Sequence, residues 1–289
     1  IVASTDIYGG TYRLFQKIAT RGGVKVTLVD TTDPGQLRSA VNRNTRIVWI
    51  ETPGNPQLSI SDIAACADIA HENGALLAVD NTFATPSLTR PLEHGADISM
   101  HSATKFLGGH SDALGGILVT RDKDLHDELY FIQNATGATL ASFDSFLISR
   151  GIKTLDLRVR AQSSSALEIA SRLSGDGRVA NVLYPGLPQH PGHELACRQM
   201  DGVFGSIVSF NVQGDFETAK RMVDGTVLFQ LAVSLGAVES LIEQPAAMSH
   251  ASYDAGDRKQ QGIDDGLVRL SVGLEDVDDL WSDLDTALA

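Results

Sequence analysis

Lys105 and Asp80 are the two residues of this chain whose types and positions most favour chemistry. Each follows an apolar segment with the pattern of a buried strand, residues 98–101 before Lys105 and 75–79 before Asp80. An open α/β sheet places its ligands at the carboxyl ends of its strands, where both residues are expected. A lysine can attach pyridoxal phosphate (PLP) through an imine, and an aspartate can keep the pyridine nitrogen protonated. Taken alone, Lys105 could be a surface lysine and Asp80 a turn residue, but the pair predicts a PLP site.

Strands and helices alternate through the first half of the chain. The sequence predicts two helices, 36–41 and 61–71, the second capped by Ser61. It also predicts strands at 24–29, 46–50, 75–79, 98–101 and 116–120. Strands separated by helices indicate a mostly parallel, doubly wound sheet, and thus an α/β fold.

The pattern changes near residue 145. Residues 144–173 are helical in pattern with Gly151 as the one interruption, and they predict a connection between two domains, 1–156 and 157–289. The second domain is expected to be α+β. Its predicted strands are 179–183, 206–212 and 267–272, and its predicted helices are 216–223 and 275–288.

Composition narrows the class of protein. The 289 residues are 43% hydrophobic and 20% charged, which is typical of globular domains. The net charge of −13 argues against a nucleic-acid partner or an anionic membrane surface. No apolar run approaches the ~20 residues of a membrane span. Residues 1–6 contain no initiator Met and have the pattern of a core strand entered midway, so we expect that an N-terminal portion is missing.

Other candidate sites are weak. Cys66 and Cys197 are too few for a disulfide framework, and their helical surroundings predict buried free thiols, which suits the cytoplasm. His101, His110 and Asp112 do not have the spacing of a standard metal site, so no metal is expected. The glycine pairs after Lys105 do not form a nicotinamide-binding motif.

Six motifs occur in register along the chain: Tyr8-Gly-Gly-Thr11, Glu51-Thr-Pro-Gly-Asn-Pro56, Val79-Asp-Asn-Thr-Phe83, Ser102-Ala-Thr-Lys105, Ser234-Leu-Gly-Ala-Val-Glu-Ser-Leu241 and Leu267-Val-Arg-Leu-Ser-Val-Gly-Leu-Glu275. Together they resemble the Cys/Met-metabolism PLP enzymes, which include cystathionine γ-synthase, cystathionine γ-lyase, methionine γ-lyase and cystathionine β-lyase. The resemblance implies the aspartate-aminotransferase-like fold (fold type I). Its large domain has a mostly parallel, seven-stranded-type sheet, here incomplete at the N-terminus, and its smaller C-terminal domain is α+β.

The resemblance assigns roles to the residues around Lys105. Lys105 would bind PLP and move protons, which requires a depressed pKa, and Asp80 would pair with the pyridine nitrogen. Ser102 and Thr104 would donate hydroxyl protons to the cofactor phosphate. As strand-end residues they could instead serve only the turn. The family's main phosphate-binding segment lies upstream of Tyr8 and cannot be assigned in this chain.

Tyr8 and Asn55 are further expected ligands. The resemblance implies that Tyr8 stacks on the cofactor ring and passes a proton to the leaving group, although it could be an ordinary half-buried aromatic residue. Asn55 would hydrogen-bond the 3′ oxygen of the cofactor or the substrate carboxylate. Its alternative is a turn asparagine between two prolines.

Arg269 lies inside an apolar strand pattern and therefore needs an anionic partner. A substrate α-carboxylate matches its planar fork, and a structural salt bridge is the alternative. The resemblance favours the carboxylate, with Ser234 assisting. At the position of Val233, cystathionine γ-lyases and γ-synthases tend to carry a glutamate. Methionine γ-lyase carries a valine there, as this chain does, and the residue is expected to contact substrate.

The expected reaction is γ-elimination or γ-replacement on a sulfur amino acid or homoserine derivative. Gly10, Gly109-His-Ser-Asp112 and Gln133-Asn134 resemble the corresponding residues of cystathionine γ-lyase or γ-synthase. Val233 and the segment Met248–Tyr253 favour methionine γ-lyase as the alternative. The resemblance also implies a homodimer or homotetramer whose subunits share the active site. An alternative of another class is a non-catalytic assembly fragment of such an enzyme.

Overall fold

The computed structural model describes residues 1–249 and 263–289, so residues 250–253 of the Met248–Tyr253 segment lie outside the described part. Contacts divide the chain into two compact units. Unit 1 contains Ile1–Thr52 and Ser61–Leu155, and unit 2 contains Pro53–Ile60 and Asp156–Ala289. The domains predicted from sequence, 1–156 and 157–289, stay a proposal; the units differ from them mainly in Pro53–Ile60.

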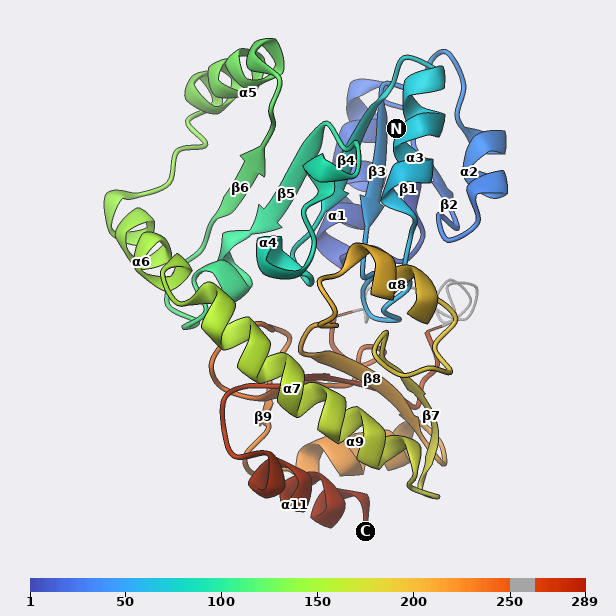
Figure 1. Ribbon diagram of the computed structural model, residues 1–289, viewed down its shortest axis with the longest axis vertical. Helices are drawn as coiled ribbons and strands as arrows, with labels where there is room; N and C mark the ends of the chain where they lie inside the picture. The colour runs from blue at the N-terminus through green and yellow to red at the C-terminus, as the bar shows by residue number, and fades with distance from the viewer. Residues whose placement is uncertain (250–262) are drawn as a thin grey trace. The chain divides into compact units, whose positions relative to one another are not determined.

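Unit 1 is built on a six-stranded sheet in the order β2-β1-β3-β4-β5-β6 (Figure 1). Its strands are β1 (Val2–Ser4), β2 (Thr27–Val29), β3 (Ile47–Glu51), β4 (Leu76–Asp80), β5 (Ile98–Ser102) and β6 (Gly116–Val119). The pairs from β2 to β5 are parallel and β5–β6 is antiparallel. The α/β prediction is confirmed, with six strands among the described residues where a seven-stranded type was expected.

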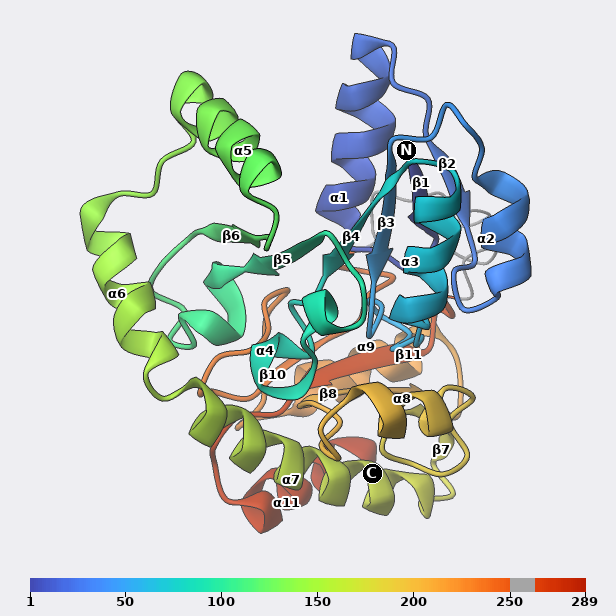
Figure 2. The same cartoon turned by 45° about the horizontal axis from the view of Figure 1, so that its top comes forward.

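The helices of unit 1 connect these strands and follow β6. The α-helices are α1 (Gly9–Arg13), α2 (Pro34–Ala40), α3 (Ile63–Glu72), α4 (Thr85–Leu88), α5 (Lys123–Thr136) and α6 (Ser142–Ile152). Shorter helical turns are η1 (Leu14–Ile18), η2 (Ala19–Gly22), η3 (Pro91–Glu93) and η4 (Ala103–Leu107). In Figure 2, α5 and α6 lie beyond β6 at one edge of the sheet.

Side-chain alternation divides unit 1 into two cores. Val48 and Ile50 of β3 pack with residues of α2 and α3 on one face of the sheet. Trp49, between them in sequence, packs with Phe15 on the other face. Because successive strand residues point to opposite faces, the same strand supplies both cores. This sheet is therefore packed on both faces.

Unit 2 contains a five-stranded sheet in the order β7-β8-β11-β10-β9. Its strands are β7 (Val179–Leu183), β8 (Ile207–Val212), β9 (Gln230–Leu231), β10 (Leu241–Glu243) and β11 (Leu267–Ser271). Its helices are α7 (Leu155–Ser174), whose first residue belongs to unit 1, α8 (His193–Gln199), α9 (Phe216–Gly225) and α11 (Val277–Leu288). Figure 1 shows α7 as the long helix that leads into this unit.

The two faces of the unit 2 sheet differ in character. Apolar residues of β8 and β11, such as Phe210 and Leu270, pack against α7, α9 and α11. The alternate residues Ser209 and Arg269 face the other way, toward the Pro53–Ile60 segment, where the Ser209 hydroxyl donates to the Pro56 carbonyl at 2.6 Å. The polar face of the sheet therefore carries buried hydrogen bonds.

Two local predictions were wrong. Asp62, rather than Ser61, caps α3, because its side chain accepts the Ala65 N–H at 3.0 Å. Cys66 is buried as expected, and burial, reinforced by Asp62, raises the pKa of its thiol to about 12. Cys197, however, is exposed on α8. Among the described residues, no helix is both long and apolar enough to cross a bilayer.

Candidate active site

Asp80 is the last residue of β4, and its carboxylate is buried. Burial raises the pKa of this carboxyl, and hydrogen bonds from Thr82 counteract part of that rise. Thr82 donates to Asp80 Oδ1 from its backbone N–H at 3.0 Å and from its hydroxyl at 2.6 Å. A buried carboxylate with neutral donors and a raised pKa is a position at which a cationic partner would be strongly stabilised.

Thr82 connects the ends of two strands. Its Oγ1 accepts the backbone N–H of Ser102, the last residue of β5, at 2.8 Å, while it donates to Asp80. The sequence reasoning gave Thr82 no role, although it stands inside one of the six motifs. A threonine two residues after a strand-end aspartate is the signal that could have identified it.

Lys105 lies in η4, which begins directly after β5. Its backbone has φ −93° and ψ −130°, so it departs from helical geometry inside this turn. Helix α6 packs against η4, and Gly151 of α6 allows the close approach, because a Cβ there would lie 2.2 Å from the Gly108 carbonyl oxygen. The segment that carries Lys105 is therefore fixed by a glycine contact.

Ser102 and Thr104 flank Ala103, where β5 meets η4, and both are half-buried. The Thr104 hydroxyl accepts the Gly115 N–H at 3.1 Å and lies 3.4 Å from the Gly115 carbonyl, which is a weak hydrogen bond. Because that bond is weak, the Thr104 hydroxyl can donate its proton to a stronger acceptor instead. The phosphate role of both hydroxyls stays a prediction.

Tyr8 precedes α1, and its side chain is 51% exposed. Its backbone N–H donates to the carboxylate of Glu51, the last residue of β3, at 2.8 Å. The ring folds over Gly10, where a Cβ would come within 2.2 Å of a ring carbon. Tyr8 therefore lies at the same end of the sheet as Asp80, because Glu51 is the register partner of Asp80. Its exposed ring is accessible to a ligand.

His101 belongs to β5 and is buried beside the site. Burial lowers the pKa of its imidazole to about 4, despite an opposing effect of the Asn81 backbone. Its Nε2 lies 3.1 Å from the Ser99 hydroxyl. The imidazole is therefore neutral at pH 7, and the described residues contain no cluster of three or more potential metal ligands.

Arg269 lies in the middle of β11 in unit 2, and its side chain is 2% exposed. Nη1 forms an ion pair with Glu243 Oε1 at 2.9 Å and donates to Asn55 Oδ1 at 2.8 Å. Nη2 lies 3.2 Å from the Ser234 carbonyl and 3.5 Å from the Val233 carbonyl. The required anion is thus supplied internally by Glu243, which the sequence reasoning missed.

The structure therefore gathers the predicted residues in two groups. The first group lies at or near strand ends of unit 1 and contains Lys105, Asp80, Ser102, Thr104 and Tyr8. Asn55, Ser234 and Val233 surround Arg269 in unit 2, and the Val233 side chain is 56% exposed.

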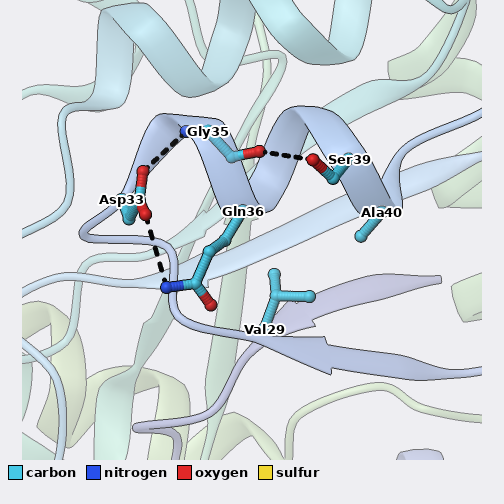
Figure 3. Close-up of a pocket in the computed structure, with 6 residues that line it drawn as sticks. All are labelled: Val29, Asp33, Gly35, Gln36, Ser39 and Ala40. Atoms are coloured by element: carbon cyan, nitrogen blue, oxygen red, sulfur yellow. Dashed lines mark hydrogen bonds between the residues drawn. The ribbon is translucent and has the colours of Figure 1, made fainter.

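A surface pocket elsewhere in unit 1 involves none of these residues. It is lined by Val29, Asp33, Gly35, Gln36, Ser39 and Ala40. Figure 3 shows that its polar groups bond to one another: Asp33 accepts from Gly35 and Gln36, and Ser39 donates to the Gly35 carbonyl. These contacts cap and support α2, so the pocket offers little to a ligand.

The whole chain, residues 1–289, matches the family described as Cys/Met metabolism PLP-dependent enzyme. The chain belongs to this family. Cystathionine gamma-lyase of Bacillus subtilis is 50% identical over 288 residues, which are 100% of this chain and 76% of that protein. Cystathionine gamma-synthase of Mycobacterium bovis is 49% identical over 288 residues, with 100% and 73% covered. Cystathionine gamma synthase of Xanthomonas oryzae, solved with aminoacrylate and cysteine, has a TM-score of 0.96 at 46% identity, with 99% and 74% covered.

This Cys/Met metabolism PLP enzyme thus has fold type I, and its cofactor is PLP. The residues present fit that cofactor. Asp80 offers a buried carboxylate that a protonated pyridine nitrogen would satisfy, and Lys105 follows the neighbouring strand. Exposed Tyr8 offers a ring face, and Ser102 and Thr104 offer hydroxyls.

Proposed function

We propose that this enzyme catalyses γ-elimination or γ-replacement on a sulfur amino acid or homoserine derivative, as a cystathionine γ-lyase or γ-synthase. The observation that carries the proposal is the buried Asp80 carboxylate, joined through Thr82 to the strand that leads to Lys105. Similarity over the entire chain to proteins named cystathionine gamma-lyase and gamma-synthase supports the substrate class. Val233 supports methionine γ-lyase as the alternative.

The proposed roles in unit 1 follow from position and charge. PLP, when bound, supplies an electron-withdrawing ring that takes up the electron pair released at the substrate α-carbon. Asp80 keeps the pyridine nitrogen protonated, because a charged partner offsets the burial of its carboxylate. Lys105 would hold the cofactor covalently. Once the substrate amino group has displaced it, its free Nζ would take the α-proton and move protons at the β-carbon. Tyr8 gives a proton to the γ-leaving group. Ser102 and Thr104 hold the phosphate.

In unit 2, Arg269 binds the substrate α-carboxylate, because its planar fork matches that group. Ser234 and Asn55 assist at the same place, since both contact Arg269. Val233 contacts the distal part of the substrate.

We also propose a homodimer or homotetramer with a shared active site, located in the cytoplasm. Several large apolar side chains near α5 and α6 are exposed, and this supports association, because extensive exposed apolar surface is usually covered. They are Leu114, Tyr130, Phe131, Ile132, Phe143 and Phe146. The free thiols Cys66 and Cys197 are compatible with a reducing compartment.

Two measurements test the function. The PLP-loaded protein is given cystathionine, methionine, homocysteine, and O-acyl-homoserine with cysteine, and the products are identified. Cleavage of cystathionine or its formation supports the proposal, and activity on methionine alone supports the alternative. Borohydride reduction and peptide mapping should then place the pyridoxyl group on Lys105. A protein that stays colourless with PLP would contradict the catalytic reading and favour an assembly fragment.

A further inference from the structure

The contacts of the Arg269 guanidinium are uneven. Nη1 has two short partners, Glu243 at 2.9 Å and Asn55 at 2.8 Å. Among the described residues, the partners of Nη2 are the carbonyl oxygens of Ser234 and Val233, at 3.2 and 3.5 Å. Nε is buried and has no hydrogen-bond partner among the residues that the structure describes. The hydrogen-bonding capacity of Nη1 is therefore filled, whereas that of Nε and Nη2 is not.

The unsaturated atoms form one edge of the planar group. Nε and Nη2 present parallel N–H bonds along that edge, which is a geometry that a carboxylate accepts with both oxygens. A buried donor without an acceptor is costly, so this edge is incomplete until a ligand supplies one. Two oxygens of an incoming carboxylate would satisfy Nε and replace the long contacts of Nη2.

Glu243 is placed by the sheet rather than by Arg269 alone. The two residues are register partners across the antiparallel β10–β11 pair, and their side chains are 1% and 2% exposed. The Ser249 hydroxyl also donates to Glu243 Oε1, at 2.9 Å. The oxygen that holds Nη1 is thus fixed by backbone pairing and by a second hydrogen bond.

We propose that Glu243 is a positioning residue: it holds Arg269 Nη1 so that the Nε–Nη2 edge is presented to the substrate α-carboxylate. This rests on the proposed function, in which Arg269 binds that carboxylate. Glu243 itself touches no substrate. Its length matters more than its charge, because the guanidinium must be held at one orientation.

Two variants separate length from charge. Glu243→Asp keeps the charge but is one methylene shorter, so its oxygen cannot hold Nη1 in the same place. Glu243→Gln keeps the length and an acceptor oxygen but loses the charge. Positioning predicts that Asp weakens carboxylate binding and that Gln does not, whereas a purely electrostatic role predicts that only Gln changes it. A merely structural role alters stability and leaves ligand selectivity unchanged.

The test is calorimetric binding to the PLP-loaded enzyme. L-norvaline has no γ-leaving group, and L-norvalinamide lacks the carboxylate, so their affinity ratio reports carboxylate recognition without turnover. We expect Glu243→Asp to lower the ratio about tenfold, as for a lost charge-assisted hydrogen bond, and Glu243→Gln not to lower it by more than about twofold. The matched control is Glu275→Asp, whose carboxylate binds Ser240 in the same unit and should keep the ratio.

Each outcome decides something. A wild-type ratio in Glu243→Asp overturns the proposal. If Arg269→Lys lowers the ratio while Glu243→Asp does not, only the role of Glu243 fails. If Arg269→Lys keeps the ratio, the proposed carboxylate role of Arg269 fails as well. Should Glu243→Asp not fold, Ser249→Ala must lower the ratio at least about threefold, because it frees the Glu243 side chain, and an unchanged ratio overturns the proposal.

Discussion

At the scale of single residues, Val233 is the position where substrate choice can be tested. Its side chain is 56% exposed, while its backbone carbonyl lies 3.5 Å from Arg269 Nη2. A glutamate here could bind the distal ammonium of cystathionine, whereas valine favours a thioether methyl. Val233→Glu should raise the ratio of kcat/KM for cystathionine over methionine by up to about fivefold, in line with ~0.2–1 kcal/mol for an ion pair at an exposed position.

The control for this experiment is Val227→Glu, the same substitution at an exposed valine of unit 2. It should leave the substrate ratio unchanged. Equal ratios in wild type and Val233→Glu would mean that the distal ammonium stays in water and that Val233 only packs.

His101 makes the free energy of unfolding depend on pH. Its pKa is about 4 in the folded protein and 6.5 when exposed, so its contribution is present above pH 6.5 and is lost as the pH falls toward 4. Between pH 7.5 and 5, wild type should lose about 2 kcal/mol more than His101→Gln, measured by urea unfolding. Between pH 7.5 and 9 the two proteins should change equally. Equal losses at pH 5 would contradict a neutral buried imidazole.

At the scale of elements, the contact between α6 and η4 controls the segment that carries Lys105. Gly151→Ala would place a Cβ 2.2 Å from the Gly108 carbonyl and 2.6 Å from that of Leu107. Since backbone must move, we expect a loss of ~1–3 kcal/mol in stability and weaker PLP binding. Gly22→Ala is the control, because a Cβ there meets nothing within 4 Å. Thermal unfolding and a PLP titration measure both effects, and wild-type PLP affinity in Gly151→Ala would show that η4 tolerates displacement.

The elements with strong periodicity could be predicted from the sequence. The strands expected at 75–79, 98–101 and 267–272 correspond to β4, β5 and β11 within one residue at each end. The antiparallel direction of β6 could not be predicted, because alternation is the same in both directions. The strands β9 and β10 have two and three residues, too few for any pattern.

For the candidate site, too, the sequence predicted what depends on local pattern and missed what depends on long-range pairing. The positions of Asp80 and Lys105 at strand ends followed from local pattern, because each stands next to its own strand. Glu243 was missed because its pairing with Arg269 depends on the register of β10 with β11, which joins distant parts of the chain. The exposure of Cys197 likewise depends on what α8 packs against, which helical pattern alone does not contain.

At the scale of the whole molecule, the exposed apolar residues of α5 and α6 should govern association. α5 has no buried residue, although Tyr130, Phe131 and Ile132 lie on it. Sedimentation at micromolar concentration should find a dimer or tetramer, and Phe143→Glu should raise the dissociation constant at least about tenfold. Val227→Glu, an exposed valine in unit 2, should have no effect. A fully active wild-type monomer would rule out a shared active site.

The discontinuity of unit 2 has a consequence for biosynthesis and for inheritance. Asn55 leaves the ribosome long before Arg269, its partner 214 positions later, and Pro56 precedes Ser209 by 153 positions. Because chains fold from the N-terminus during synthesis, Pro53–Ile60 cannot complete its contacts with Ser209 and Arg269 until those residues have been made. A gene break at residue 155 would likewise separate Asn55 from Arg269. Unit 2 therefore cannot be completed, or passed between genes, as one continuous segment of the chain.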